Sequence, residues 1–477
     1  MVFSHRYRLA AALAALAITS GAGGALAEDA RRAPERPSEP GRLTVSDAMT
    51  IETQGAHNAT VAVDRRTRAV YLAFAKEVAD AAAPAAAGGG KKADPRLEAR
   101  LARSTDGGRS FGASVAVSPP EHHVKSHTVS PTRVAVGPAG EVFVLYNSEA
   151  SDGSHVGARP RNLLELARSD DEGRSFAPPV EIASEAVEGA IGSPGMINLF
   201  VAPDGAVYGS WLDYREMIDY MRTHHKMPPK TENIATQLRM ARSGDGGRSF
   251  AKSVLVTKPV CGCCGTIMAQ GKDGPVYAST RGAWRELKGS VDAVRDIVVA
   301  ASRDRGETWS SAVKVHDDGF KISGCPDVAP GLAVDGKGRL HAAWYTGSER
   351  HPGVFYAVSS DEGRSFSEPV ALLTDDWLPY ADVKLALDAK GNAWVAFEDR
   401  RGDVDLVRLA RIGADGSLAF AEPWPGTIPD LAAVGDSVVV ASGALAPSGG
   451  DERDGGGIEV RVAHPPAPDP KSAGSRS

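Results

Sequence analysis

The chain has little cysteine, few aromatic residues and no long hydrophobic run. Four of its 477 residues are cysteine, and 6% are aromatic. The most apolar stretch, LAAALAALAI at residues 9–18, is shorter than the roughly 20 residues that a membrane-spanning helix needs. Basic residues are not in excess, since the formal net charge is -6. These absences argue against a membrane span and against a nucleic-acid partner.

The N-terminus has the composition of an export signal. A basic start precedes the short apolar stretch, and a small-x-small cleavage site ends at Ala27. We therefore expect residues 1–27 to be a signal peptide and the mature protein to be periplasmic or secreted. Residues 28–41 and 465–477 are rich in polar residues and proline, so we expect a disordered tether and a disordered tail. The range 42–464 is then a single folded domain.

One short motif recurs along the chain and is the strongest signal for the fold. Five segments fit Ser-x-Asp-x-Gly-x-Ser/Thr-Phe/Trp, and a sixth, around Asp415, keeps only part of the motif. The six aspartates are 54 to 74 residues apart; those of the five full copies are Asp106, Asp171, Asp245, Asp304 and Asp361. The pattern is typical of a hairpin turn, in which Asp bonds the turn backbone and Gly takes a positive φ.

The segments around each motif predict four antiparallel strands per repeat. In the fifth repeat, residues 331–335, 339–346, 354–360 and 368–373 alternate apolar and polar residues or are β-rich. Four strands per repeat without room for crossover helices predict an all-β propeller. Six clear four-stranded units and three more strands near the C-terminus predict seven blades, with residues 42–47 adding the missing outer strand. A ring of six blades is the alternative.

The repeats resemble the Asp-box (BNR) repeats of the sialidase-like β-propeller superfamily. The segment at 295–309, with GCPDVAPGLAVD and LHAAWYTG after it, resembles a branch of exported bacterial propellers with paired cysteines. The resemblance implies that the repeat turns join third to fourth strands, opposite the usual ligand site. It places that site on the central face, built by the segments that lead into each first strand and by the loops after each second strand. We expect a small-molecule, glycan or protein ligand there, and a monomer.

All four cysteines are expected on this central face. The stretch VCGCCGTIM leads into blade four, and SGCPDVAPG leads into blade five; they carry Cys261, Cys263, Cys264 and Cys325. Export favours disulfides, and Cys325 paired with one of the other three would link adjacent blades. A second interpretation is a site for copper or zinc, because thiolates favour such ions. Histidines in the same kind of segment are candidate co-ligands: His57, His122, His123 and His127. A redox or nucleophilic thiol beside a histidine is the third interpretation.

A sialidase would need a further set of residues. In the superfamily, three arginines bind the substrate carboxylate, one of them in Arg-Ile-Pro, and a Tyr–Glu pair supplies the nucleophile. No Arg-Ile-Pro occurs in this chain. The remaining candidates are Arg281, Arg295 and Arg400 for the arginines and Tyr345 or Tyr380 with Glu398 for the pair. We therefore predict a propeller that binds a ligand or a thiophilic metal without sialidase activity. A glycosidase with an altered arginine clamp and a protein-interaction scaffold are the alternatives.

Overall fold

The structure is a computed structural model, and the unit considered below is Pro37–Ser477. It describes residues 41–52, 54–78, 95–149, 155–156, 159–183, 186–187, 190–191, 193–226, 235–284, 293–322, 324, 326–445 and 457–466. The expected signal peptide, nearly all of the expected tether, most of the expected tail and Cys325 therefore lie outside the described residues. The strands described run from Gly41 to His464.

Seven antiparallel sheets follow one another along the chain and confirm the predicted seven-bladed, all-β propeller. Each blade begins with its inner strand. Blade one consists of β4 (Ala56–Val63), β5 (Val70–Val78), β6 (Arg96–Ser104) and β7 (Val115–Ala116). Blade two consists of β9 (Arg133–Val136), β10 (Val142–Glu149), β13 (Asn162–Ser169) and β14 (Val180–Ile182). Blade three consists of β17 (Pro194–Val201), β18 (Val207–Asp213), β19 (Thr236–Ser243) and β20 (Val254–Val260). Blade four consists of β21 (Ile267–Gln270), β22 (Val276–Arg281), β24 (Ile297–Ser302) and β25 (Val313–Lys314). Blade five consists of β27 (Gly331–Val334), β28 (Leu340–Thr346), β29 (Gly353–Ser359) and β30 (Val370–Thr374). Blade six consists of β31 (Val383–Leu387), β32 (Ala393–Asp399), β33 (Leu406–Ile412) and β34 (Leu418–Phe420).

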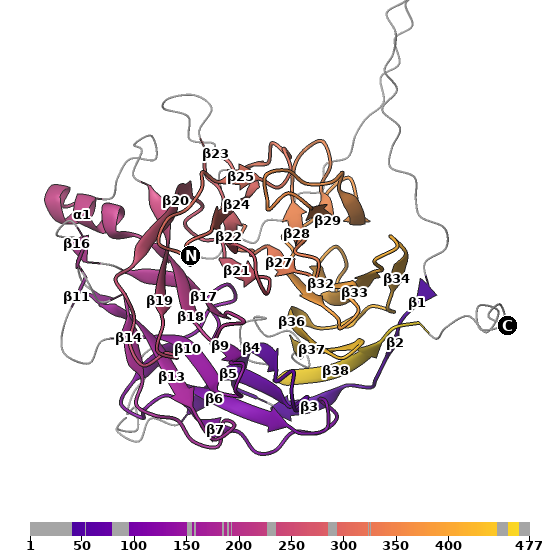
Figure 1. The fold of residues 1–477 in the computed structure, drawn as a ribbon, viewed down its shortest axis with the longest axis horizontal. Helices are drawn as coiled ribbons and strands as arrows, with labels where there is room; N and C mark the ends of the chain where they lie inside the picture. The colour runs from indigo at the N-terminus through magenta and orange to yellow at the C-terminus, as the bar shows by residue number, and fades with distance from the viewer. Residues whose placement is uncertain are drawn as a thin grey trace, which may run out of the picture. The chain divides into compact units, whose positions relative to one another are not determined.

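Blade seven joins the two ends of the chain. Its first three strands are β36 (Thr427–Val434), β37 (Ser437–Gly443) and β38 (Ile458–His464). On β38 lie β2 (Thr44–Val45) and β3 (Met49–Glu52), both antiparallel, so the N-terminal segment supplies the outer strand as predicted. The inner strand β36 also contacts β4, which closes the ring (Figure 1).

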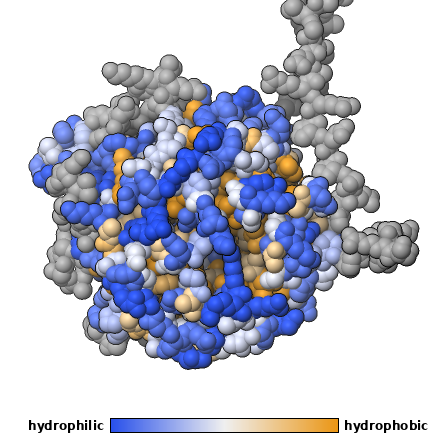
Figure 2. All heavy atoms as spheres, in the orientation of Figure 1, coloured by the Kyte–Doolittle hydropathy of each residue, from blue (hydrophilic) through white to orange (hydrophobic). Residues whose placement is uncertain are grey.

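The core lies between neighbouring blades, because each sheet has apolar side chains on both faces. One cluster combines Phe74 of blade one with Val439 of blade seven, and similar clusters fill the other interfaces. The second strands carry fully buried tryptophans whose ring N–H donates to a carboxylate: Trp211 to Asp213, Trp344 to Asp318 and Trp394 to Asp388. Hydrophilic residues cover most of the face seen in Figure 1, and apolar side chains show only in recesses between them (Figure 2).

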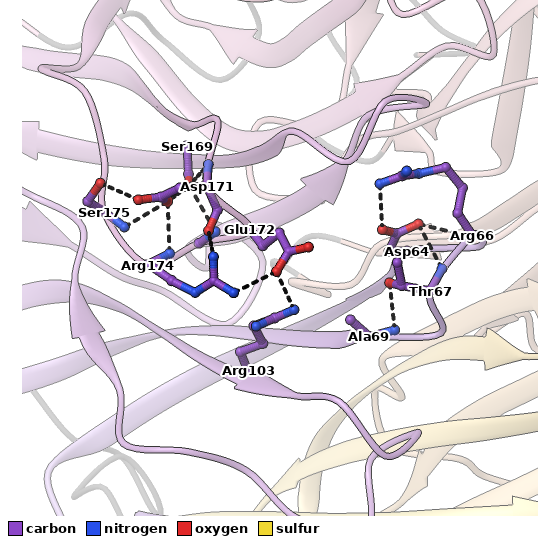
Figure 3. A network of polar contacts seen from close by, with 11 residues as sticks. Asp64, Arg66, Thr67, Ala69, Arg103, Ser169, Asp171, Glu172, Arg174 and Ser175 are labelled. Atoms are coloured by element: carbon purple, nitrogen blue, oxygen red, sulfur yellow. Dashed lines mark hydrogen bonds and ion pairs between the residues drawn. The ribbon is translucent and has the colours of Figure 1, made fainter.

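The five repeat turns, centred on Asp106, Asp171, Asp245, Asp304 and Asp361, share one set of contacts. In the second, Asp171 accepts bonds from the N–H groups of Arg174 and Ser175 and from the hydroxyls of Ser169 and Ser175 (Figure 3). Gly173 follows with φ +80° and donates its N–H to Ser169. A Cβ there would lie 2.6 Å from Leu101 of blade one, so the turn needs glycine for both conformation and space. We call the side of the propeller that carries these turns the turn face.

One helix, α1 (Arg215–His224), lies between β18 and β19. Asp213 fixes its start, since its carboxylate accepts bonds from the backbone N–H and the guanidinium of Arg215. Within the described part of the chain, the helical structure is too short and too polar to cross a membrane.

Candidate functional site

The central face, opposite the turn face, begins where the chain enters each inner strand. Three of these strands start with a β-bulge and a residue of positive φ: Asn58 in β4, Met196 in β17 and Ile428 in β36. Asp327, before β27, has φ +47°. Residues other than glycine rarely adopt this conformation, and for a β-branched residue such as Ile428 it is a clear outlier. Backbone strain of this kind persists where the fold enforces it, often at functional sites.

Residues 261–264 form a buried turn directly after β20. The backbone N–H of Cys261 donates to the carbonyl of Arg281, at 2.8 Å, which attaches the turn to blade four. The hydroxyl of Tyr214 donates to the carbonyl of Gly262, at 2.7 Å. A Cβ on Gly262 would lie 3.0 Å from the Thr236 hydroxyl, so a larger residue would push the turn away from blade three.

Three sulfur atoms meet inside this turn. The thiol of Cys264 donates to the sulfur of Cys261 at 2.9 Å, and the sulfur of Cys263 lies 3.5 Å from that of Cys261. All three residues are buried, and Cys261 and Cys264 are free thiols. These sulfur atoms lie within 4.8 Å of one another, close enough to bind one metal ion. The structure thus brings together three of the four predicted cysteines; the fourth, Cys325, is outside the described residues.

Charge makes the two free thiols unlike each other. Arg295 donates to the sulfur of Cys261 at 2.9 Å. The hydrogen bond from Cys264 and the positive charge of Arg295 lower the pKa of Cys261 to about 6. Burial and the neighbouring Cys261 raise the pKa of Cys264 well above its usual range. The turn therefore favours one thiolate, at Cys261, with a protonated thiol directly beside it.

The predicted histidines are not part of the sulfur cluster in the described chain. His57 pairs with Glu77 at 3.1 Å, and His122 pairs with Glu165 at 2.9 Å. His123 is exposed in β8 (His123–Lys125). Burial raises the pKa of Asp327, and His127 lies near enough to that carboxyl to oppose the shift. A histidine role in metal binding stays a prediction.

The arginines predicted for a carboxylate clamp lie in different surroundings. Arg281 is fully buried and donates to two backbone carbonyls, those of Arg295 at 2.6 Å and Tyr345 at 2.7 Å. Arg295 binds the sulfur of Cys261, as described above. Arg400, in blade six, donates to Asp405 at 3.2 Å. Two of the three candidates thus meet, but they meet around the cysteine turn.

The predicted tyrosine–glutamate pair occupies two separate hydrogen-bond networks. Tyr345 donates its hydroxyl to the carbonyl of Leu378, and burial raises the pKa of Tyr345 to about 12. Tyr380 packs edge-on against Tyr345, with ring centroids 6.2 Å apart. Glu398 accepts the backbone N–H of Ile428 at 2.7 Å. Burial and the charge of Asp382 raise the pKa of Glu398.

Sequence reasoning missed most of a charged cluster near the propeller axis. Arg133, Lys384 and Asp430 line a central cavity of about 170 Å³ between the inner strands. Lys384 pairs with Asp382, whose second carboxylate oxygen is buried without a hydrogen-bond partner in the structure. Burial raises the pKa of Asp430. The signal in the sequence is faint: one charged residue within each of three otherwise apolar inner strands.

Exposed aromatic residues stand on the segment that leads into blade six. The side chain of Trp377 is 70% exposed and that of Tyr380 is 38% exposed. The hydroxyl of Tyr380 lies 3.8 Å from the position that a Cβ on Gly324 would take. The charge of Asp327 contributes to the raised pKa of Tyr380. Trp377 and Tyr380 therefore present aromatic surface beside a polar part of the central face.

No protein-family model and no curated protein matches the chain. Among solved structures, it is similar to a polysaccharide lyase of family PL25, an ulvan lyase, at 10% identity and TM-score 0.50, over 88% of this chain and 95% of that chain. It is also similar to the α-L-arabinofuranosidase Arb93A from Fusarium graminearum, at 11% identity and TM-score 0.49, over 88% and 97%. The Hadza microbial sialidase Hz136 is 15% identical, with TM-score 0.46, over 74% of this chain and 66% of that chain. At 10% identity the likeness to the ulvan lyase shows the β-propeller fold alone.

Proposed function

We propose that the protein binds a soft metal ion, copper(I), through Cys261 and Cys264 on its central face. The observation that carries the proposal is the pair of buried free thiols with sulfur atoms 2.9 Å apart. Small side-chain movements would place both sulfurs on one ion. Thiolates are the ligands that copper(I) prefers in proteins.

Copper(I) fits these surroundings better than zinc. Structural zinc sites use four ligands, usually Cys and His, in tetrahedral geometry. The described residues bring no histidine within the 4.8 Å group of ligand atoms. Two thiolates on copper(I) also carry one net negative charge, which the guanidinium of Arg295 offsets from 2.9 Å. Zinc(II) with two thiolates forms a neutral centre, which has no net negative charge for the same guanidinium to offset.

We also propose that Cys263 and Cys325 form a disulfide that links blades four and five. The free thiols among the described cysteines are Cys261 and Cys264, which leaves Cys263 available for a disulfide. Because the chain has only four cysteines, Cys325 is the remaining partner. Such a bond agrees with export to an oxidising compartment, the periplasm or the medium, and with the signal peptide expected at residues 1–27. Cys263 would then fix the turn, while its two neighbours bind the metal.

The test is a copper(I) titration of purified, reduced protein against a colorimetric copper(I) chelator under anaerobic conditions. We expect about one copper per chain, lost in Cys261→Ser and in Cys264→Ser. The Cys263→Ser/Cys325→Ser double variant is the matched control, since it keeps the metal-binding pair and leaves no third thiol beside it. Equal copper binding by the wild-type protein and the Cys261→Ser/Cys264→Ser double variant would overturn the proposal. Parallel titration with zinc tests the preference for copper.

A sugar ligand is the second candidate, and the exposure of Trp377 favours it. Aromatic rings exposed beside polar groups suit sugars, whose C–H faces stack on them while hydroxyls form hydrogen bonds. We expect sugar binding to change the tryptophan fluorescence of the wild-type protein, but not of Trp377→Ala. Val404→Ala removes another exposed apolar side chain and serves as control. A fluorogenic sialoside assay on the same samples tests the alternative of a glycosidase, for which we expect no turnover.

A further inference from the structure

We infer that Cys261 and Cys264 form a reversible disulfide, so that oxidation closes the metal site and reduction opens it. This inference rests on the proposed function in one respect, because the same two sulfur atoms bind the metal. It adds a modification site and a condition for binding: the protein takes up copper(I) only in its dithiol form. The expected bridge between Cys263 and Cys325 is separate and stays closed in both forms.

The geometry of the turn favours this pair over the other pairs within residues 261–264. Cys261 and Cys264 are three residues apart, as in Cys-x-x-Cys motifs, and their sulfurs are 2.9 Å apart. A disulfide has a sulfur–sulfur length of about 2.05 Å, so closure needs about 0.9 Å of movement. The Cys261 and Cys263 sulfurs are farther apart, at 3.5 Å. The hydroxyl of Tyr214, which binds the carbonyl of Gly262, holds the turn in this curved form.

The contacts also assign the order of attack. Arg295 lies against the sulfur of Cys261 and stabilises its thiolate, the nucleophilic form. Cys264 directs its S–H at the same sulfur and is therefore placed to resolve an oxidised Cys261. Both residues have no exposed surface, which excludes attack on a protein disulfide without opening of the turn. The oxidant must therefore be small, and we name hydrogen peroxide as the chemical class.

The reaction balances as two steps. The thiolate of Cys261 attacks one oxygen of the peroxide, forms an S–O bond and releases hydroxide, which takes up a proton to leave as water. The thiol of Cys264 then attacks the sulfur of this sulfenic acid, forms the S–S bond and releases the oxygen as a second water. Two thiols lose two electrons and two protons in total, and the peroxide gains them. Any external thiol reverses the reaction by thiol–disulfide exchange once the turn opens.

The experiment uses the full chain with Cys263→Ser and Cys325→Ser, in which Cys261 and Cys264 are the remaining cysteines. One equivalent of peroxide is added to the reduced, metal-free protein, and the intact mass is measured. We expect a loss of about 2 Da, the two hydrogen atoms of the thiols, restored by dithiothreitol. With Cys264→Ala added, the mass cannot fall, and we expect a sulfenic acid at Cys261 that dimedone traps. Fragment mapping of the oxidised wild-type protein gives the same answer if the double variant folds poorly.

The outcomes separate this inference from the proposed function. Copper(I) binding to the reduced protein, lost after peroxide and regained after dithiothreitol, supports both. Copper binding that peroxide leaves unchanged, or a gain in mass at Cys261 without loss of 2 Da, overturns the disulfide and leaves the metal site standing. Closure of the disulfide in a protein that binds no copper in either form overturns the metal site alone.

Discussion

The two faces of the propeller differ in how far their residues repeat from blade to blade. On the turn face, five blades carry the same carboxylate in the same network, from Asp106 to Asp361. On the central face, the segments that lead into the blades differ: a cysteine turn, an aromatic segment with Trp377, and bulges at Asn58, Met196 and Ile428. Repetition of a residue in five blades indicates that it serves the structure of each blade. Residues found in one blade only are the ones available for a function of the whole ring.

The carboxyl groups of the two faces differ in the same way. Hydrogen bonds, led by that from Ser110, lower the pKa of Asp106 to about 2. Burial instead raises the pKa of Glu398, Asp430 and Asp327 on the central face. A carboxylate whose oxygens all accept hydrogen bonds stabilises a fold. A buried carboxyl with a raised pKa does not, so its presence needs a reason other than stability. The contrast supports the proposal that the functional chemistry lies on the central face.

The largest expected effect is a loss of stability when a structural residue, Arg281, is removed from the central face. Arg281→Ala would leave two buried carbonyls unpaired and open a space beside Phe320, on which the guanidinium stacks at 5.3 Å. We expect a loss of about 3–5 kcal/mol in the free energy of unfolding, measured by urea denaturation. Arg295→Ala is the matched control: about 1 kcal/mol in stability, with weaker copper(I) binding. A stable Arg281→Ala that loses sugar-ligand binding would instead revive the carboxylate clamp.

The second prediction removes one repeat turn. Asp171→Ala deletes four hydrogen bonds, two from backbone N–H groups and two from serine hydroxyls (Figure 3). We expect a loss of about 1–2 kcal/mol, as for other capping carboxylates, seen as a lower urea midpoint. Copper(I) binding should stay unchanged, because the turn lies on the other face. An effect of Asp171→Ala on copper affinity would contradict the division of roles between the two faces.

Stability as a function of pH should respond with opposite signs on the two faces. The folded pKa of Asp106 is depressed, so its contribution is present above the unfolded value of 3.8 and is lost as pH falls toward 2. The folded pKa of Glu398 is raised, so its contribution is present below the unfolded value of 4.5 and is lost as pH rises through the folded pKa. Asp106→Asn should therefore flatten the acid limb of the stability curve, and Glu398→Gln the limb above pH 4.5. Urea midpoints measured between about pH 2 and 8 test both; equal slopes in both variants would remove the contrast.

Much of the fold could be predicted because the sequence motif of each repeat turn marks where that turn lies in its blade. Five copies of one turn fix third and fourth strands, and the remaining strands follow by alternation. The closure of blade seven by the N-terminal strands could also be predicted, since three C-terminal strands lacked a fourth. The location of the cysteine turn before blade four followed from the same count of strands. All these inferences use local patterns and the number of blades.

The rest of the site could not be predicted, because it depends on contacts between distant residues. Arg133 and Asp430 line one cavity although about 300 residues separate them, and only ring closure brings them together. The guanidinium of Arg281 resembles a clamp residue in sequence, but its orientation toward two carbonyls is a property of the folded backbone. The close approach of the Cys261 and Cys264 sulfur atoms, by contrast, could have been predicted from the sequence. A spacing of three residues permits a disulfide that neighbouring cysteines do not form easily.

The smallest expected effect concerns a charge pair between blades on the turn face. Arg103 of blade one donates to Glu172 in the turn of blade two at 2.7 Å (Figure 3). Arg303 pairs with Glu362 at the equivalent place between blades four and five. Their side chains are partly exposed, so water and salt screen the attraction. A double-mutant cycle of Arg103→Ala and Glu172→Ala should give a coupling energy of about 0.5 kcal/mol that shrinks in high salt. A coupling above about 1.5 kcal/mol that is insensitive to salt would mean that the turn face also joins the blades by charge, and not only by the apolar clusters beneath it.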